Sequence, residues 1–125
     1  MIDYKMNMYK EHILDLYKHP HNFGKMENPD FSLREFNPLC GDDLTIQVKV
    51  KDGKIEDVKF FGNGCAISIA SASLLTDKIK GMKINDVKKM KSEEVIEMLG
   101  IPISPARVKC VLLCFEALKR GLKNE

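Results

Sequence analysis

Residues 44–61, LTIQVKVKDGKIEDVKFF, predict two antiparallel strands joined by a tight turn. In the first half of this stretch apolar and polar residues alternate, which is the period of a strand with one buried face. Asp52-Gly53 is a dipeptide that favours a short hairpin turn. The returning strand places Val58 and Phe60 on one face. This hairpin is expected to form the centre of the sheet.

The flanking sequence predicts a third strand and a set of helices. An edge strand is expected over residues 31–37, and a helix with Asp3 as N-cap over residues 3–18. The apolar face of that helix is expected to comprise Met6, Tyr9, Ile13, Leu14 and Tyr17. Further helices are expected over residues 66–80, 84–90, 92–99 and 105–122, the last with Ser104 as N-cap and Pro105 in its first position. This order indicates an α+β fold in a single domain, residues 1–125: an N-terminal helix, a three-stranded antiparallel sheet, and helices packed on one face.

Composition and charge exclude several classes of function. The 125 residues carry 20 basic and 18 acidic side chains, so the net charge of +2 gives no electrostatic case for nucleic acid. The lysine-rich stretch 78–91 is interpreted as a solvated surface. No apolar run reaches the roughly 18 residues of a membrane helix, and acidic residues scattered through positions 1–20 are unlike a signal peptide. We therefore expect a cytoplasmic protein whose cysteines are thiols or ligands rather than disulfides.

Three cysteines and one carboxylate stand at the starts or ends of separate predicted elements. Cys40-Gly41-Asp42 precedes the central strand, Cys65 follows a Gly-Asn-Gly turn, and Cys110 lies near the start of the last helix. None of them belongs to the close Cys-x-x-Cys pairs of a rigid zinc knuckle. A hard oxygen ligand among soft sulfurs favours a metal site that can release what it holds. Either Asp42 or Asp43 could supply the oxygen, and Asp42 is preferred because the strand is expected to begin near Leu44.

The surroundings of each cysteine suggest different roles. Cys65 would stand at the N-terminus of the helix beginning at Ala66, where the helix dipole favours a thiolate. Gly62 and Gly64 would leave room for a cofactor, and the small serines of residues 68–73 are interpreted as packing residues. Cys110 has Arg107 and Lys109 as neighbours, which are expected to lower the pKa of its thiol. Cys114, one turn later, is interpreted as a buried spectator, although its spacing would let it assist or replace Cys110.

The chain resembles the IscU/SufU/NifU N-terminal family of iron–sulfur cluster assembly scaffolds along nearly all its length. The shared marks are Tyr9 and ILDLY at 13–17 with Pro20, Asn22 and Gly24, NPLCGD at 37–42, GNGCAIS at 62–68 with ASAS at 70–73, and RVKC at 107–110. The resemblance implies that Cys40, Asp42, Cys65 and Cys110 hold a [2Fe–2S] cluster or Zn²⁺. It also implies a cysteine desulfurase as sulfur donor and apo iron–sulfur proteins as clients.

Departures from the family pattern qualify this expectation. IscU members carry His before the last cysteine; Lys109 stands there in this chain, as in SufU members, yet the insertion of about twenty residues that SufU members carry before that cysteine is missing. Residues 103–107, ISPAR, replace the Leu-Pro-Pro-Val-Lys that IscU offers to an Hsp70-type chaperone, which argues against such a partner.

The leading hypothesis is a cluster scaffold with Cys110 as persulfide acceptor and Asp42 as a mobile, exchangeable ligand. One alternative is a zinc-dependent sulfur acceptor that stimulates its desulfurase. A further alternative, from a different class, is an interaction domain with purely structural zinc.

Overall fold

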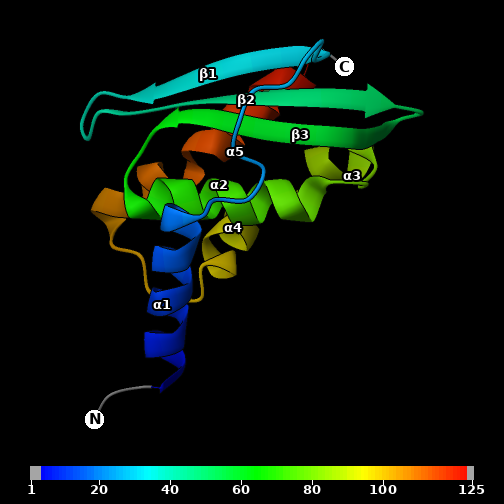
Figure 1. The fold of residues 1–125 in the computed structure, drawn as a ribbon. Helices are drawn as coiled ribbons and strands as arrows, with labels where there is room; N and C mark the ends of the chain where they lie inside the picture. The colour runs from blue at the N-terminus through cyan, green and yellow to red at the C-terminus, as the bar shows by residue number, and fades with distance from the viewer. Residues whose placement is uncertain (1–3, 124–125) are drawn as a thin grey trace.

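A three-stranded antiparallel sheet forms one layer of the molecule, and the helices all lie on one side of it, some against the sheet and others against those helices (Figure 1). The computed structural model describes residues 4–123. The elements are α1 (Tyr4–Lys18), β1 (Phe31–Asn37), β2 (Asp42–Lys51), β3 (Lys54–Asn63), α2 (Ala66–Ile79), α3 (Ile84–Lys88), α4 (Ser92–Met98), the 3₁₀ turn η1 (Pro105–Arg107) and α5 (Val108–Leu122). The predicted α+β architecture is thus confirmed. Among the described helices, none has the length and apolar character needed to cross a membrane.

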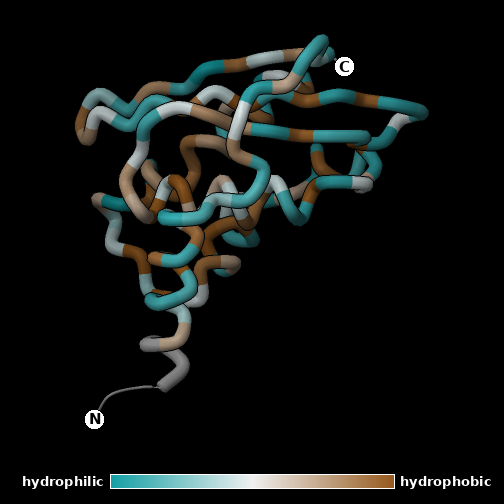
Figure 2. Tube along the Cα trace, viewed as in Figure 1, coloured by the Kyte–Doolittle hydropathy of each residue, from teal (hydrophilic) through white to brown (hydrophobic). Residues whose placement is uncertain are grey.

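The hydrophobic core lies between the sheet and helices α2 and α5. The strands run in the order β1-β2-β3, and the hairpin predicted at residues 44–61 forms its expected register, with Ile46 opposite Phe60 and Val48 opposite Val58. Those four side chains are fully buried. Helix α5 packs under β1 and β2, while α2 packs under β3. Figure 2 shows the resulting alternation of hydrophobic and hydrophilic residues along the strands.

The elements differ from the sequence-based expectations mainly at their ends. Strand β2 begins at Asp42 rather than near Leu44, so both acidic residues belong to the strand. Residues 105–107 form a 3₁₀ turn before α5, because Pro105 starts a tight turn rather than a continuous α-helix. Among the side chains of α1 that the structure describes, from Met8 onward, Ile13 and Leu16 are buried, while Tyr9, Leu14 and Tyr17 are exposed. The side chain of Met6 and the predicted N-cap Asp3 lie outside the described part.

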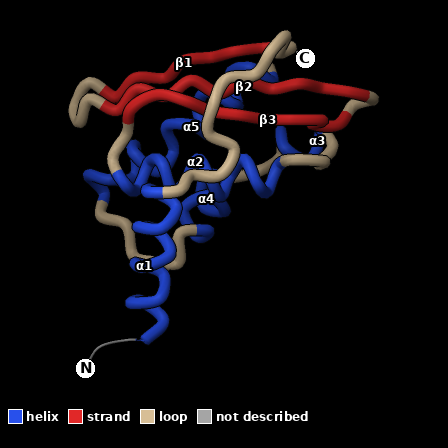
Figure 3. Tube along the Cα trace, in the orientation of Figure 1, coloured by secondary structure: helices blue, strands red, loops and turns tan. Residues whose placement is uncertain are grey.

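The loop from His19 to Asp30 crosses from α1 over the sheet to β1 (Figure 3). It follows the outer edge of β3, where the N–H of Gly24 donates to the carbonyl of Phe60 and the N–H of Phe60 donates to the carbonyl of Asn22. The side-chain amide of Asn22 donates to Thr76 and Asp77 of α2 at 2.8 and 2.9 Å. The loop is therefore fastened both to the sheet and to the helix beneath it.

The serines of α2 make specific hydrogen bonds between elements, which corrects their interpretation as packing residues alone. The hydroxyl of Ser71, buried in the core, donates to the carbonyl of Val111 in α5 at 2.7 Å. The hydroxyl of Ser73 accepts the backbone N–H of His21 at 3.2 Å. Small side chains let the neighbouring backbones approach this closely. As a result, α2 is bonded to α5 on one side and to the loop after α1 on the other.

Gly62 allows β3 to pass very close to β2. A Cβ at this position would lie 2.1 Å from the carbonyl oxygen of Asp43, and the backbone of Gly62 has φ +131°. Sequence reasoning assigned this space to a cofactor. In the structure this space is filled by the backbone of β2. Gly62 itself lies three residues before Cys65.

Replacing Gly62 should therefore destabilise the fold. We expect Gly62→Ala to lower the free energy of unfolding by about 3 kcal/mol, because it combines backbone strain with a steric clash. Gly53→Ala is the matched control: its φ is +74° but nothing lies within 4 Å of the added Cβ, so the loss should be about 1 kcal/mol. Urea unfolding of both variants measures the difference, and equal losses would contradict the role of the close strand contact.

Candidate metal centre

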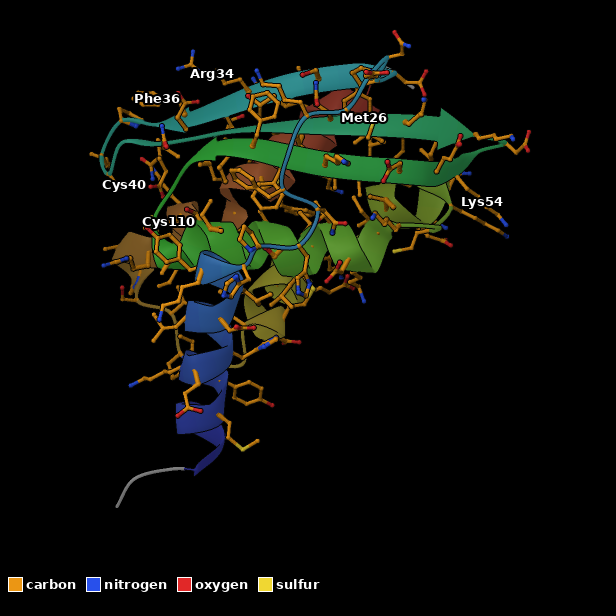
Figure 4. All side chains as sticks on the ribbon, viewed as in Figure 1. Met26, Arg34, Phe36, Cys40, Lys54 and Cys110 are labelled. Atoms are coloured by element: carbon orange, nitrogen blue, oxygen red, sulfur yellow. The ribbon has the colours of Figure 1, made fainter. Side chains whose placement is uncertain are left out.

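Three regions of the chain bring the predicted site residues to one end of the molecule. Cys40 lies in the β1–β2 turn, Asp42 is the first residue of β2, Cys65 is the N-cap of α2, and Cys110 lies in the first turn of α5. Figure 4 shows Cys40 and Cys110 at this end, opposite the hairpin that carries Lys54.

Asn37 shapes the turn that presents Cys40. Its side-chain oxygen accepts the N–H of Leu39 at 3.1 Å, and its carbonyl accepts the N–H of Gly41 at 2.8 Å. Gly41 has φ +77°, a conformation that favours glycine. The turn is thus held by local hydrogen bonds, with the Cys40 side chain exposed at its tip.

Two pairs of side chains in the site lie at separations close to those of ligands on one metal ion. Ligand atoms of Cys40, Asp42 and Cys110 all lie within 4.8 Å of one another, the one such group found among the described residues. The Sγ atoms of Cys40 and Cys110 are 3.5 Å apart, and Sγ of Cys65 lies 3.5 Å from Oδ2 of Asp42. In a tetrahedral site the expected separations are about 3.8 Å for two sulfurs and about 3.6 Å for sulfur and carboxylate oxygen. Cys65 lies outside this group of three and contacts it through Asp42.

Asp42 is firmly held, contrary to the expectation of a freely swinging carboxylate. It is 4% exposed, and its Oδ1 accepts the backbone N–H of Cys65 at 3.0 Å. This places the carboxylate at the N-terminus of α2, where the helix dipole favours negative charge. One carboxylate oxygen is thus engaged by the helix, while Oδ2 lies next to the Cys65 sulfur.

Asp43 lies on the other face of the strand and forms a different interaction. Both of its oxygens accept hydrogen bonds from Arg34 of β1, at 2.7 and 2.6 Å. These hydrogen bonds hold the pKa of the Asp43 carboxyl below its usual value. Alternation along β2 therefore separates the two neighbouring acids: one faces the sulfurs and the other pairs with an arginine.

The thiol of Cys110 has a pKa raised to about 12, which is the opposite of the expected lowering. Burial is the main cause, followed by the hydrogen bond with Cys40 and the negative charges of Cys65, Asp42 and Cys40. Cys110 is 3% exposed, whereas the side chains of Arg107 and Lys109 are exposed to solvent. Arg107 and Lys109 therefore do not lower the pKa of the Cys110 thiol, because burial and the neighbouring acidic groups have the larger effect.

Cys114 lies in the hydrophobic core rather than with the other sulfurs. It is buried among apolar side chains of the core, and burial alone raises the pKa of its thiol to about 12. It is absent from the group of ligand atoms within 4.8 Å. Cys110 and Cys114 are one helical turn apart, yet Cys110 lies at the site and Cys114 lies in the hydrophobic core.

Sequence reasoning missed one polar neighbour of the site, Ser68. Its hydroxyl oxygen lies 3.6 Å from Sγ of Cys65. A Cβ on Gly64 would lie 2.4 Å from that oxygen, so the space predicted for a cofactor beside Gly64 is taken by the serine. The combination of a glycine before Cys65 and a serine three residues after it was the available signal.

A comparison with protein families matches residues 8–124 to the NifU-like N-terminal domain. The chain belongs to this family. Among relatives of the NifU-like domain, the iron–sulfur cluster assembly scaffold protein IscU 1 of Archaeoglobus fulgidus is 39% identical over 115 residues, which cover 92% of this chain and 74% of the relative. The scaffold protein IscU of Escherichia coli K12 is 35% identical over 120 residues, covering 93% of this chain and 92% of the relative.

Solved structures of NifU-like domains share the fold. A structure from Fervidobacterium islandicum, described as a cluster assembly scaffold protein for the SUF system, superposes with a TM-score of 0.75 at 30% identity, covering 90% of this chain and 94% of that one. The N-terminal part of a NifU-like protein from Brucella abortus superposes with a TM-score of 0.75 at 22% identity, covering 95% of this chain and 96% of that one, and shows the fold alone.

The four cysteines of this NifU-like domain should differ in reactivity when no metal is bound. Alkylation requires an accessible thiolate, so we expect iodoacetamide to modify the exposed Cys40 first, the half-buried Cys65 next, and Cys110 and Cys114 last. Peptide mass spectrometry over time measures the order at neutral and mildly alkaline pH. In denaturant the four rates should converge, and Cys110 reacting as fast as Cys40 in the folded protein would contradict the buried, high-pKa site.

Proposed function

We propose that this chain is an iron–sulfur cluster assembly scaffold, a single carrier domain over residues 1–125. It receives sulfur from a cysteine desulfurase, assembles a [2Fe–2S] cluster and passes the cluster to apo-proteins. The observation that carries this proposal is the convergence of three thiols and one carboxylate from separate elements at one end of the fold. Relatives named as scaffolds, 35–39% identical over most of the chain, support it.

Cys40, Asp42, Cys65 and Cys110 are the proposed ligands of the cluster. Thiolates are the usual ligands of such clusters, and one carboxylate among them is a harder partner for iron. Cys40 is exposed while Cys110 is buried, so the cluster would be covered by protein on one side and accessible on the other. A site that is accessible and has mixed ligands suits a cluster that is transferred to another protein.

A second candidate is a zinc-dependent sulfur acceptor that stimulates its desulfurase. The observation that favours it is the close group of Cys40, Asp42 and Cys110, whose ligand atoms all lie within 4.8 Å of one another. The Sγ atoms of Cys40 and Cys110, 3.5 Å apart, have about the spacing of two sulfurs on one Zn²⁺. In this case the same four residues would hold Zn²⁺, and no cluster would be assembled.

Cys110 remains the proposed persulfide acceptor, and the structure suggests a route to it through Cys40. Cys110 is buried, but its Sγ lies 3.5 Å from that of the exposed Cys40. The outer sulfur of a donor persulfide would move to the Cys40 thiol, which regenerates the donor thiol. As the Cys110 sulfur takes up this outer sulfur, its thiol proton would move to the departing Cys40 sulfur 3.5 Å away, which regenerates the thiol of Cys40.

The surface around Cys40 suits contact with the sulfur donor. Leu39 is 83% exposed, and Phe36 also exposes its ring beside the turn. A groove of about 280 Å³ lies next to them, between residues 35–38 on one side and Lys109, Leu112, Leu113 and Glu116 of α5 on the other, so its lining includes two carboxylates, Glu35 and Glu116. Apolar side chains next to a reactive thiol are typical of a surface that a partner covers.

Anaerobic reconstitution tests the scaffold. With a cysteine desulfurase, cysteine and Fe²⁺, we expect about one [2Fe–2S] cluster per protein or per dimer, measured by visible spectrum and iron content, and transferable to an apo-ferredoxin. Cys40→Ala, Cys65→Ala and Cys110→Ala should each abolish stable binding because each removes a proposed ligand. Cys114→Ala is the control and should keep most of it.

Two outcomes would overturn these assignments. Stoichiometric Zn²⁺ that iron and desulfurase do not displace, with no transferable cluster, would favour the sulfur-acceptor function. Loss of metal in Cys114→Ala as complete as in Cys110→Ala would show that the ligand chosen on α5 is wrong.

Sulfur transfer to the metal-free protein tests the acceptor. After reaction with persulfidated desulfurase, peptide mass spectrometry should find the added sulfur on Cys110. Cys110→Ala should retain it on Cys40, and Cys40→Ala should slow labelling of Cys110, because the buried thiol loses its exposed neighbour. Labelling of Cys110 at an undiminished rate in Cys40→Ala would refute the route.

A further inference from the structure

Ser68 stands in the first turn of α2 with its side chain almost completely enclosed. It is 1% exposed, and its hydroxyl oxygen has two neighbours on Cys65: the carbonyl oxygen at 3.1 Å and Sγ at 3.6 Å. The hydroxyl of Ser68 donates a hydrogen bond to the carbonyl of Cys65. The thiol of Cys65 is a weak donor, and it can donate either to the hydroxyl oxygen of Ser68 or to Oδ2 of Asp42, which lies at 3.5 Å.

Gly64 keeps the place for this hydroxyl. A Cβ on Gly64 would come within 2.4 Å of Oγ of Ser68, and its next contact would be a methyl carbon of Ile69 at 3.4 Å. Because Gly64 has no side chain, the hydroxyl of Ser68 has room to lie next to the loop that carries Cys65. The position of the hydroxyl is set by the sequence on both sides of the cysteine.

Metal binding changes the direction in which this contact can form a hydrogen bond. A sulfur bound to a metal is a thiolate without a proton, so it can only accept. The hydroxyl hydrogen of Ser68 can turn about its C–O bond towards Sγ without moving a heavy atom. The carbonyl of Cys65 is not left unpaired by this turn, because it also accepts the N–H of Ile69 at 3.0 Å.

We propose that Ser68 is a positioning residue that donates a hydrogen bond to the metal-bound sulfur of Cys65 and so lowers the electron density on that one ligand. The inference rests on the ligand role of Cys65 in the proposed function. Hydrogen bonds to ligand sulfurs tune the metal and its redox potential. In the described part of the chain, Ser68 supplies the one side-chain hydroxyl in contact with a ligand sulfur, whereas the sulfurs of Cys40 and Cys110 contact each other.

Cobalt substitution gives a readout that does not depend on cluster transfer. Co²⁺ bound to the purified, metal-free protein should show a thiolate-to-cobalt charge-transfer band. In Ser68→Ala the band should move to longer wavelength, because a sulfur without the hydrogen bond gives up electron density more easily. Ser68→Thr keeps the hydroxyl and should restore the wild-type position.

Two further variants make the test specific. Ser73→Ala removes another buried serine of α2, whose hydroxyl contacts the N–H of His21 and not the site, and should leave the band in place. Gly64→Ala keeps Ser68 but crowds its hydroxyl, and should shift the band as Ser68→Ala does. Circular dichroism of each metal-free variant checks that the fold is retained, and Gly64→Ala serves alone if Ser68→Ala does not fold.

The outcomes separate this inference from the proposed function. Absence of a charge-transfer band in the wild-type protein would overturn the metal centre and this inference with it. A normal wild-type band that stays in place in Ser68→Ala or Gly64→Ala would overturn the role of Ser68 alone. A shift of equal size in Ser73→Ala would also overturn it, because the effect would then come from α2 as a whole.

Discussion

The site depends on one hydrogen bond, from the backbone N–H of Cys65 to the carboxylate of Asp42. Asp42 is the first residue of β2 and Cys65 is the N-cap of α2, so this contact joins the start of the central strand to the start of the central helix. It also satisfies one of the N–H groups that the beginning of a helix leaves unpaired. The same carboxylate therefore contributes to the fold and to the site, and its free oxygen is positioned by the bonded one.

The position of the last helix completes the arrangement. The hydroxyl of Ser71 holds α2 to the carbonyl of Val111, the residue directly after Cys110. Cys65 and Cys110 thus lie on two helices that are bonded to each other, next to Cys110 in the chain. The exposed Cys40 belongs to the β1–β2 turn instead, which is shaped by local hydrogen bonds. Three of the proposed ligands are consequently on helices or a strand, and one is on a turn at the surface.

Local patterns were sufficient to predict the sheet and the helices. Alternation over 44–51 fixed the buried face of β2, and the start of α2 followed from the glycines before Cys65. Contacts between distant segments were not predictable in this way. The raised pKa of the Cys110 thiol comes from burial against Cys40, Asp42 and Cys65, and the bond of Ser71 to Val111 spans 40 residues. Neither leaves a periodic or local signal in the sequence.

The loop that follows α1 has a consequence for how the protein behaves in a crowded solution. Because Asn22 and Gly24 pair with Phe60, part of the outer edge of β3 offers no open row of backbone groups to another strand. At the opposite edge β1 carries Arg34 and Glu35, and Arg120 of α5 binds to that strand. Charged side chains at an edge discourage the addition of a foreign strand. Both edges of the sheet are thus partly protected against pairing with a foreign strand, so the end that carries the exposed Cys40 can stay open to partners while the sheet edges do not promote aggregation.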